Sequence, residues 1–181
     1  MRRRAESGFT LTELMVTLAI MAIVTTIALP SFRDTIQRNR VVTANNEVVG
    51  GISLARTEAI RTARGGGICG ANADGTDCAT SGTTWSNGWI VWADADATLG
   101  FNAGTDTIVR RIEPNSKITL SVPDGASDLK RQIVFNRRGM LNNGVRTITL
   151  QPADCAAGKP LKRTLDVKLV GQVTTTQGNC S

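Results

Sequence analysis

The chain has 181 residues but no histidine and no tyrosine. Without an imidazole, it has no histidine to act as a general base and none to bind a metal ion. Its four cysteines show no C-x-x-C spacing, which excludes a thioredoxin-like redox pair and a zinc knuckle. These absences weigh against an enzyme, and we expect neither a resident metal nor a cofactor.

The cysteines are Cys69, Cys78, Cys155 and Cys180. An even number in an exported chain favours disulfides over four reduced thiols. Three pairings are possible, and proximity in the sequence favours Cys69–Cys78 and Cys155–Cys180. The first would close a loop rich in Gly, Asn and Asp, and the second would fix the C-terminal tail.

Positive charge is concentrated towards the end of the chain. Residues 129–181 hold nine basic and two acidic side chains, whereas residues 33–128 hold nine basic and eleven acidic ones. Such asymmetry is typical of a surface for nucleic acid or anionic lipid. A solvated face with scattered arginines explains the same counts, and both interpretations stay open here.

Residues 9–29 form an apolar run in which Glu13 carries the only charge. At 1.5 Å per residue, such a helix spans about 30 Å, the thickness of a bilayer core. Arg2, Arg3 and Arg4 would keep the short N-terminal side in the cytoplasm. We therefore expect a single-pass protein of the bacterial inner membrane with a periplasmic C-terminal head.

The leader MRRRAESG followed by FTLTEL resembles the type IV prepilin signal, in which a short basic leader ends in Gly before Phe-Thr-Leu-x-Glu-Leu. The resemblance implies that a prepilin peptidase cuts between Gly8 and Phe9 and that the new amine of Phe9 is N-methylated. It also implies three kinds of partner: the prepilin peptidase, other major and minor pilins, and the inner-membrane assembly machinery. The membrane would hold the chain before assembly into the pilus.

A charge such as that of Glu13 costs about 2.5–3.5 kcal/mol at the centre of a bilayer. When pilin helices bundle, a buried carboxylate needs a partner, and the Phe9 amine of a neighbouring subunit can supply it. We predict that this salt bridge also sets the register between subunits. The alternative is an ordinary membrane anchor that tolerates Glu13. Pro30, just past the span, is predicted to kink the helix.

The helix is predicted to continue beyond the span, because apolar residues recur at three- and four-residue spacing. Gly50 and Gly51 mark either a close approach to a sheet or a soft point, and Gly65-Gly66-Gly67 is predicted to end the helix. The apolar stripe consists of Val41, Ala44, Val48, Ile52, Ala55 and Ala59.

Short β-type runs between turn signals follow the helix. Asn142-Asn143-Gly144 is predicted to be a hairpin turn that places Val134 and Ile148 in facing strands. The fold class is α+β, a long N-terminal helix packed on an antiparallel β-sheet head. The domains are a leader (1–8), an apolar helix (9–32), its amphipathic continuation (33–64) and the head (65–181). The strands are predicted at 89–93, 108–112, 117–122, 132–136, 147–151 and 164–170.

Three stretches of the head, WSNGWIVWAD, IVFNRRGML and LKRTLDVKLVGQV, are similar to the FimT/GspH group of minor pilins and pseudopilins. That group has a W-x-x-G-W strand, an I-x-F-x-x-x-G hairpin and a final strand ending in Gly. With the signal, the resemblance spans most of the chain.

Two clusters in the head have both a functional and a structural interpretation. Trp85, Trp89 and Trp92 could stack bases or bind a ligand, but the alternation of Trp89 with Ile90 and Val91 in a strand favours core packing for at least one of them. The other cluster is Asp94, Asp96 and Asp106 in the loop DADATLGFNAGTD. A calcium loop needs Gly and Glu where Leu99 and Thr105 stand, so ordinary acidic turn residues are favoured.

The basic residues are the candidates for binding double-stranded DNA. Some FimT proteins bind DNA through a G-R-x-R motif near the C-terminus, where this chain has Gly171-Gln172-Val173-Thr174. The resemblance therefore does not carry DNA binding over, but a non-specific, salt-sensitive contact with phosphates stays open. The candidates are Arg137, Arg138, Arg146, Lys159, Lys162, Arg163 and Lys168.

Three functions remain. The favoured one is a minor type IV pilin of the FimT/FimU kind in the tip or priming complex of the pilus. The second is a pilus-associated module that captures DNA for natural transformation. The third is a type II secretion pseudopilin of the GspH kind.

Overall fold

The structure is a computed structural model that describes residues 9–80, 85, 87–122, 131–142 and 144–181. The predicted leader with Gly8, and Asn143 of the predicted turn, lie outside these residues. The chain divides into two compact units, Met1–Arg38 and Asn39–Ser181, and each is considered by itself.

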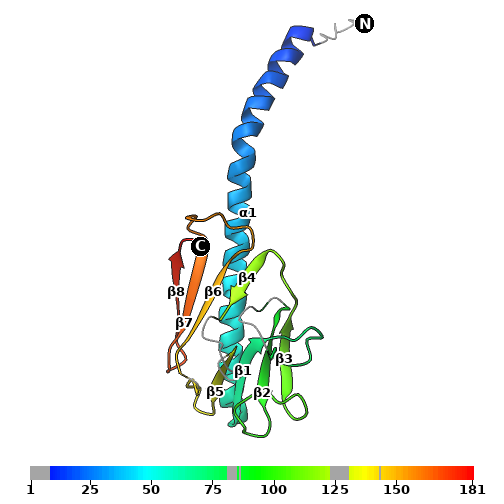
Figure 1. Ribbon diagram of the computed structural model, residues 1–181. Coiled ribbons are helices and arrows are strands. Elements are labelled where there is room, and N and C mark those ends of the chain that lie inside the picture. The colour runs from blue at the N-terminus through cyan, green and yellow to red at the C-terminus, as the bar shows by residue number, and fades with distance from the viewer. Residues whose placement is uncertain (1–8, 81–84, 86, 123–130, 143) are drawn as a thin grey trace, which may run out of the picture. The chain divides into compact units, whose positions relative to one another are not determined.

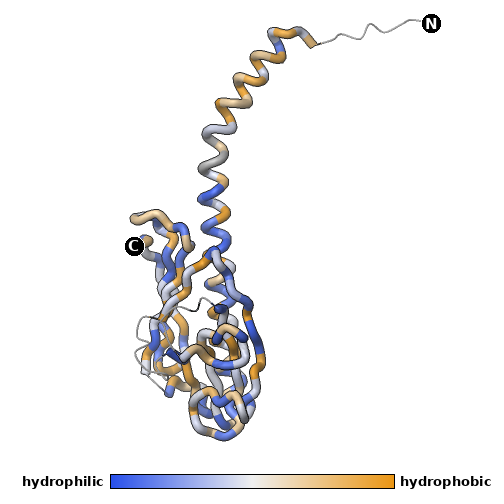
Figure 2. Tube along the Cα trace, turned by 45° about the vertical axis from the view of Figure 1, so that its right-hand side comes forward, coloured by the Kyte–Doolittle hydropathy of each residue, from blue (hydrophilic) through white to orange (hydrophobic). Residues whose placement is uncertain are grey.

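The first unit consists of the apolar part of helix α1, which runs from Leu11 to Thr62. This helix is long and apolar enough, by length and composition, to cross a membrane, and none of its most apolar window is buried. Figure 2 shows the hydrophobic colouring along this part of α1. The backbone is helical through Pro30, and a kink at that proline stays a prediction.

Threonine side chains within the apolar part of α1 bond back to the helix itself. The hydroxyl of Thr17 donates to the carbonyl of Leu14, and that of Thr26 donates to the carbonyl of Ile23. Because these hydroxyls find acceptors one turn back, they need no water. These threonines are therefore compatible with an apolar environment.

The second unit is built from two four-stranded antiparallel sheets beside the later part of α1 (Figure 1). The first sheet has the order β3-β2-β1-β5, and the second has the order β4-β6-β7-β8. The strands are β1 (Gly65–Gly70), β2 (Trp89–Asp94), β3 (Thr107–Ile112), β4 (Ile118–Ser121), β5 (Gln132–Asn136), β6 (Arg146–Pro152), β7 (Lys162–Val167) and β8 (Val173–Gly178).

A single main core joins the helix to both sheets. The predicted stripe of α1 is buried throughout and packs against residues such as Ile68 of β1 and Leu165 of β7. A smaller core lies on the other face of the first sheet, where the rings of Trp92 and Phe101 are 5.8 Å apart. Because both faces of the first sheet are covered, β1 and β2 are buried at every position.

The predicted α+β fold class is confirmed, with three corrections. The glycines at positions 65–67 do not only follow the helix; they open β1, a central strand that was not predicted. The predicted pairing of Val134 with Ile148 is wrong, because Val134 pairs with Gly67 in one sheet and Ile148 pairs with Leu165 in the other. Strand β8 was not predicted either.

Gly66 and Gly67 show why β1 is rich in glycine. A Cβ at Gly66 would lie 3.1 Å from the carbonyl oxygen of Ala55 in α1, and one at Gly67 would lie 2.7 Å from the ring of Trp92. Glycine in a strand marks such close approaches. The helix and the smaller core can therefore both pack directly onto the backbone of β1.

Candidate functional site

Glu13 lies in the first turn of α1 and is exposed. Its backbone N–H donates to Oγ1 of Thr10 at 3.3 Å, and the N–H of Leu14 donates to the carbonyl of Thr10 at 3.2 Å. Thr10 therefore caps the helix, and T-x-x-E has the spacing of a capping box. A negative charge in the first turn also interacts favourably with the helix dipole.

The carboxylate of Glu13 has no hydrogen bond or ion pair with the residues that the structure describes. The apolar side chains around it are exposed as well, and Phe9 is 82% exposed. A single copy of the chain therefore leaves both the carboxylate and the apolar surface of this helix uncovered.

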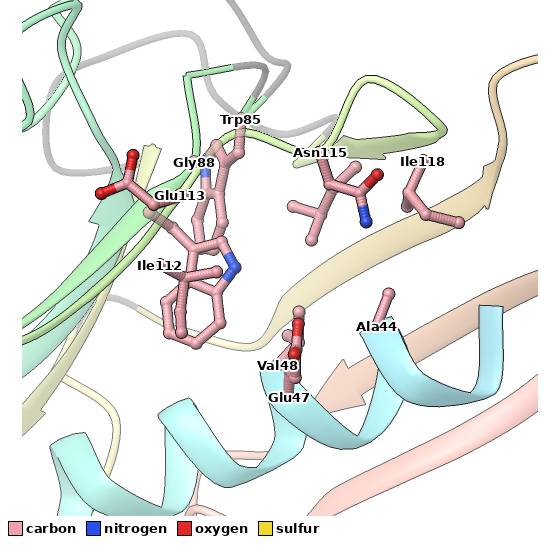
Figure 3. Close-up of a pocket in the computed structure, with 11 residues that line it drawn as sticks. Ala44, Glu47, Val48, Trp85, Gly88, Ile112, Glu113, Asn115 and Ile118 are labelled. Carbon is pink, nitrogen blue, oxygen red and sulfur yellow. The ribbon is translucent and has the colours of Figure 1, made fainter. Parts of the chain in front are cut away.

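The three tryptophans are core residues, as the structural interpretation predicts. Trp85 and Trp89 are 7% and 4% exposed, and Trp92 is fully buried. Trp85 and Trp89 line a cavity of about 30 Å³ beside Glu47 of α1 (Figure 3). Space of this size holds water rather than a base or a drug-sized ligand, which needs a pocket of roughly 300 Å³ or more.

The structure brings Asp94, Asp96 and Asp106 together, with one carboxylate oxygen of each within 4.8 Å of the others. Hydrogen bonds inside the loop account for these carboxylates. Asp94 accepts from the backbone N–H groups of Ala97 and Leu99 at 2.6 and 3.1 Å. The cluster therefore closes its own loop, which is the function of ordinary acidic turn residues.

Two of these carboxyl groups have shifted pKa values. The hydroxyl of Thr98, with help from that of Thr105, lowers the pKa of Asp96 to about 2. Burial raises the pKa of Asp106, against the opposing effect of hydrogen bonds from backbone N–H groups. The two shifts have opposite signs because Asp96 is exposed and Asp106 is half-buried.

The basic residues considered for DNA do not form one patch. Lys162 and Arg163 begin β7, whereas Lys168 follows its last residue, roughly 20 Å away at 3.3 Å per residue. The register pairs Arg146 with Val167, so Arg146 lies at the Lys168 end of the sheet. The set is therefore divided between the two ends of the second sheet.

Exposure separates the basic residues further. Arg137, Arg138 and Lys168 are exposed, whereas Lys162 and Arg163 are half-buried. Arg146 is only 7% exposed, and its Nη1 donates to the carbonyl of Val145 at 3.0 Å. Arg146 is therefore withdrawn from any surface that could meet a phosphate.

Two glycines hold the turn that carries Arg137 and Arg138 against the β7–β8 turn. A Cβ at Gly171 would lie 2.8 Å from the carbonyl oxygen of Gly139 and 2.9 Å from Nε of Arg56. The backbone φ of Gly171 is +77°, which disfavours other residues. The N–H of Leu141 also donates to the carbonyl of Leu169 at 2.8 Å, which links the two turns.

The structure contains the disulfides Cys69–Cys78 and Cys155–Cys180, the pairs that sequence proximity favours. The first joins β1 to the loop after it, and the second ties the segment after β8 to the β6–β7 connection. The first bridge therefore fixes an irregular loop to the first sheet, whereas the second joins two irregular segments that flank strands of the second sheet.

The sequence interpretation missed three features. The capping function of Thr10 had a signal, the T-x-x-E spacing. The packing of Arg56 between Gly139 and Gly171 had none, because residues distant in the sequence create it. Strand β8 had only a weak signal, since threonine also favours turns.

Comparisons with known protein families and solved structures agree with the resemblance found in the sequence. Residues 44–171 match the family described as type II transport protein GspH, and residues 3–29 match the prokaryotic N-terminal methylation motif. The fold is similar to that of the type IV minor pilin FimU of Pseudomonas aeruginosa PAO1, solved in two crystal forms. In space group P21, the TM-score is 0.54 at 18% identity over 77% of this chain and 90% of that chain.

The second crystal form, in space group P65, gives a TM-score of 0.50 at 18% identity over 74% of this chain and 90% of that chain. Curated proteins give no match to the chain. At this identity, the likeness to FimU shows the fold alone, whereas the GspH match covers well over half of the sequence.

Proposed function

The chain belongs to the GspH family of type IV minor pilins and pseudopilins, and from this premise we propose that it is built into a type IV pilus, in the tip or priming complex. The observation that carries this proposal is that the surface of the N-terminal part of α1 is uncovered. Its apolar side chains and the carboxylate of Glu13 have no partner among the described residues of one copy.

The mechanism follows from that surface. The apolar helix is held in the inner membrane, with the disulfide-bonded head in the oxidising periplasm. Prepilin peptidase cuts between Gly8 and Phe9, and the N-methylated amine of Phe9 becomes free. In the filament the helices bury their apolar faces together, and Glu13 pairs with the amine of a neighbouring subunit. Breaking such a buried pair costs about 3–5 kcal/mol.

The test replaces Glu13 by valine in the full chain. We expect Glu13→Val to insert into the membrane as the wild type does, because the change removes a charge from an apolar segment. We expect its amount in sheared filaments to fall at least tenfold. Thr17→Val, a change of similar size one turn later, is the control and should be incorporated normally. Equal incorporation of Glu13→Val would refute the salt bridge.

A second candidate function is DNA capture for natural transformation, and the exposure of Arg137, Arg138 and Lys168 favours it. The full chain in detergent would be titrated with salt in a gel-shift assay. Each phosphate contact contributes about −0.9 to the slope of log affinity against log salt concentration. Arg137→Ala/Arg138→Ala should reduce that slope by about 2, and Lys117→Ala, at an exposed lysine outside the candidate set, serves as the control. Weak retardation at low salt would retire this function.

The third candidate, a type II secretion pseudopilin, shares the signal and the fold. The description of the matched family favours it. Deletion of the chain separates the two assemblies: loss of surface pili supports the pilus, and loss of protein export with normal pili supports the secretion system. The neighbouring genes give an independent test, because genes for pilus assembly support the pilus and genes for protein secretion support the secretion system.

A further inference from the structure

Two turns of the head lie side by side at the end of the head where α1 ends (Figure 1). One turn follows β5, and the other joins β7 to β8. The N–H of Leu141 donates to the carbonyl of Leu169 at 2.8 Å, which joins the two turns. A Cβ at Gly139 would lie 2.7 Å from Cδ1 of Ile60, so the turn after β5 packs against α1. The two turns and the last part of α1 therefore form one continuous surface.

This surface holds most of the exposed large apolar side chains of the head. Among the described residues of 39–181 there are seven such side chains, and five of them lie here, between 42% and 56% exposed. Val145 belongs to this end because its neighbour Arg146 pairs with Val167, the last residue of β7. The five residues are Ile60, Met140, Val145, Leu169 and Val170.

The β7–β8 turn has an unusual pair of residues at its tip. The N–H of Gly171 donates to the carbonyl of Lys168 at 2.7 Å, which closes a turn with Leu169 and Val170 in its two central positions. Turns usually have Gly, Pro, Asn, Asp or Ser in such positions. Single exposed apolar residues are normal, but a cluster of them marks an interaction site. The cluster at this tip therefore indicates a partner with an apolar part.

The same surface carries four basic side chains. Arg137, Arg138 and Lys168 are exposed, and a Cβ at Gly171 would lie 2.9 Å from Nε of Arg56. In the part of the chain that the structure describes, none of the four forms an ion pair with an acidic side chain. We call these four basic residues and the five apolar residues the tip patch.

Nearby acidic side chains do not cancel the charge of the tip patch. Asp166 lies two residues before Lys168, and its carboxylate accepts from the hydroxyl of Thr147 at 2.8 Å. Glu58 of α1 is paired with Arg61. The acidic loop after β2 begins two strands away from β5, roughly 10 Å at about 4.8 Å per strand. Four basic groups and the one carboxylate of Asp166 leave a net charge of +3.

We propose that the tip patch binds the surface of an anionic phospholipid bilayer. The apolar side chains enter the boundary between headgroups and acyl chains, and the arginines and the lysine pair with lipid phosphates. The stems of the basic side chains add apolar contact while their charged ends stay at the headgroups. This inference goes beyond the pilus proposal and does not depend on it.

The combination of charge and apolar surface selects the bilayer among anionic partners. The phosphates of DNA match the arginines, but a charged DNA backbone leaves Leu169 and Val170 without an apolar partner. An acidic protein surface would need an apolar hollow that fits a projecting turn. A bilayer supplies phosphates and a deformable apolar layer together.

The test uses the full chain inserted in nanodiscs of phosphatidylcholine, so that its apolar helix is already in lipid and cannot bind the vesicles. The discs are mixed with vesicles of phosphatidylglycerol, which are anionic, or of phosphatidylcholine, which have no net charge. Sedimentation of the vesicles measures the bound chain, and empty discs give the background. We expect the affinity to be at least about tenfold higher for phosphatidylglycerol, because basic residues near an anionic surface attract it.

Two variants separate the apolar part of the patch from its charge. Leu169→Ser/Val170→Ser keeps every charge and should lower the affinity for phosphatidylglycerol at least about tenfold. Arg137→Ala/Arg138→Ala should lower it about 25-fold, since each basic residue contributes roughly fivefold. Thermal unfolding checks that both variants fold.

Two matched controls should bind as the wild type does. Val42→Ser/Val109→Ser removes the two exposed large apolar side chains of the head that lie outside the patch. Lys117→Ala removes an exposed charge outside it.

A duplex DNA fragment added to the same discs distinguishes the other anionic partner. Binding to phosphatidylglycerol that the serine variant leaves unchanged would overturn the proposal, and tight binding of DNA by that variant would then identify a site for polyanions. Equal binding to both kinds of vesicle, or no binding of the wild type to phosphatidylglycerol, would also overturn it. The pilus assignment is unaffected by these results, because the presence of the chain in filaments decides it.

Discussion

The indole ring of Trp89 in β2 lies directly on Gly51 of α1. A Cβ atom at position 51 would lie 2.5 Å from Cζ3 of that ring and 3.1 Å from Cδ1 of Ile68, whereas one at Gly50 would have nothing within 4 Å. Of the two neighbouring glycines, only Gly51 is therefore needed for packing. It lets the helix approach the first sheet within the main core.

The two glycines give a matched pair of substitutions. Gly51→Ala should lower the free energy of unfolding by about 1–3 kcal/mol, because overpacking outweighs the gain in helix propensity. Gly50→Ala should raise it by about 0.5–1 kcal/mol, since it gains propensity without a clash. Thermal unfolding of both variants in detergent measures the difference. A Gly51→Ala chain as stable as Gly50→Ala would contradict this packing.

A second substitution tests the junction of the two turns. Gly171→Ala should destabilise the head by about 2 kcal/mol or more, because the added Cβ meets Gly139 and the φ of +77° strains other residues. Thermal unfolding measures the effect. Gly178→Ala, at the end of β8, adds a Cβ that has no heavy atom within 4 Å, so it should change the midpoint of thermal unfolding little. Equal midpoints for the two variants would show that the turns are not packed as described.

The two disulfides should contribute unequally to stability. Their cysteines are 25 and 9 residues apart in the sequence. In the chain-entropy account, the Cys155–Cys180 bridge contributes about 3.5 kcal/mol and the Cys69–Cys78 bridge about 2.6 kcal/mol. Denaturant unfolding of Cys155→Ser/Cys180→Ser and of Cys69→Ser/Cys78→Ser compares them. A larger loss for the shorter loop would show that local packing, rather than chain entropy, dominates.

The low pKa of Asp96 predicts a pH dependence. Its folded pKa of about 2 lies below the unfolded value of about 3.9, so its contribution is full above pH 4 or so. That contribution is lost as the pH falls through 2. The difference in melting temperature between wild type and Asp96→Asn should therefore shrink between pH 5 and 2. Asp154→Asn, on an exposed turn, controls for the loss of a charge. A difference in melting temperature that does not change with pH would refute the lowered pKa of Asp96.

The elements that could be predicted are those with a strong local pattern. The apolar stripe from Val41 to Ala59 gave the buried face of α1, and the run QIVFN at 132–136, with Ile133, Val134 and Phe135 at its centre, gave β5 with the same bounds as the structure. Strand β1 could not be predicted, because Gly66 and Gly67 are chosen for tertiary contacts that the sequence does not show. Glycine alone favours turns.

The wrong hairpin has a similar cause. The turn after β5 lies before Asn142. In this turn the N–H of Asn136 donates to the carbonyl of Met140 at 2.9 Å, and the chain folds back on β5. The following residues then cross to the second sheet. Local turn propensity could not choose between these alternatives, because the decision rests on which sheet buries Ile148.

The N-terminal residues of the candidate site could be predicted because the processing signal fixes their spacing in the sequence. Gly8, Phe9 and Glu13 could be named from the sequence, although their functions stay predictions. The basic residues could not be sorted in this way, since burial of Arg146 and the separation of Lys162 from Lys168 depend on the sheet. Residues that lie close together in the sequence therefore need not lie on the same surface.

The account depends most on the fate of Phe9. Intact-mass and peptide analysis of the chain recovered from sheared filaments measures it directly. The account predicts a chain that starts at Phe9 with a methylated amine, without the eight preceding residues. A filament-associated chain that still begins at Met1, or filaments from which the chain is absent, would contradict it.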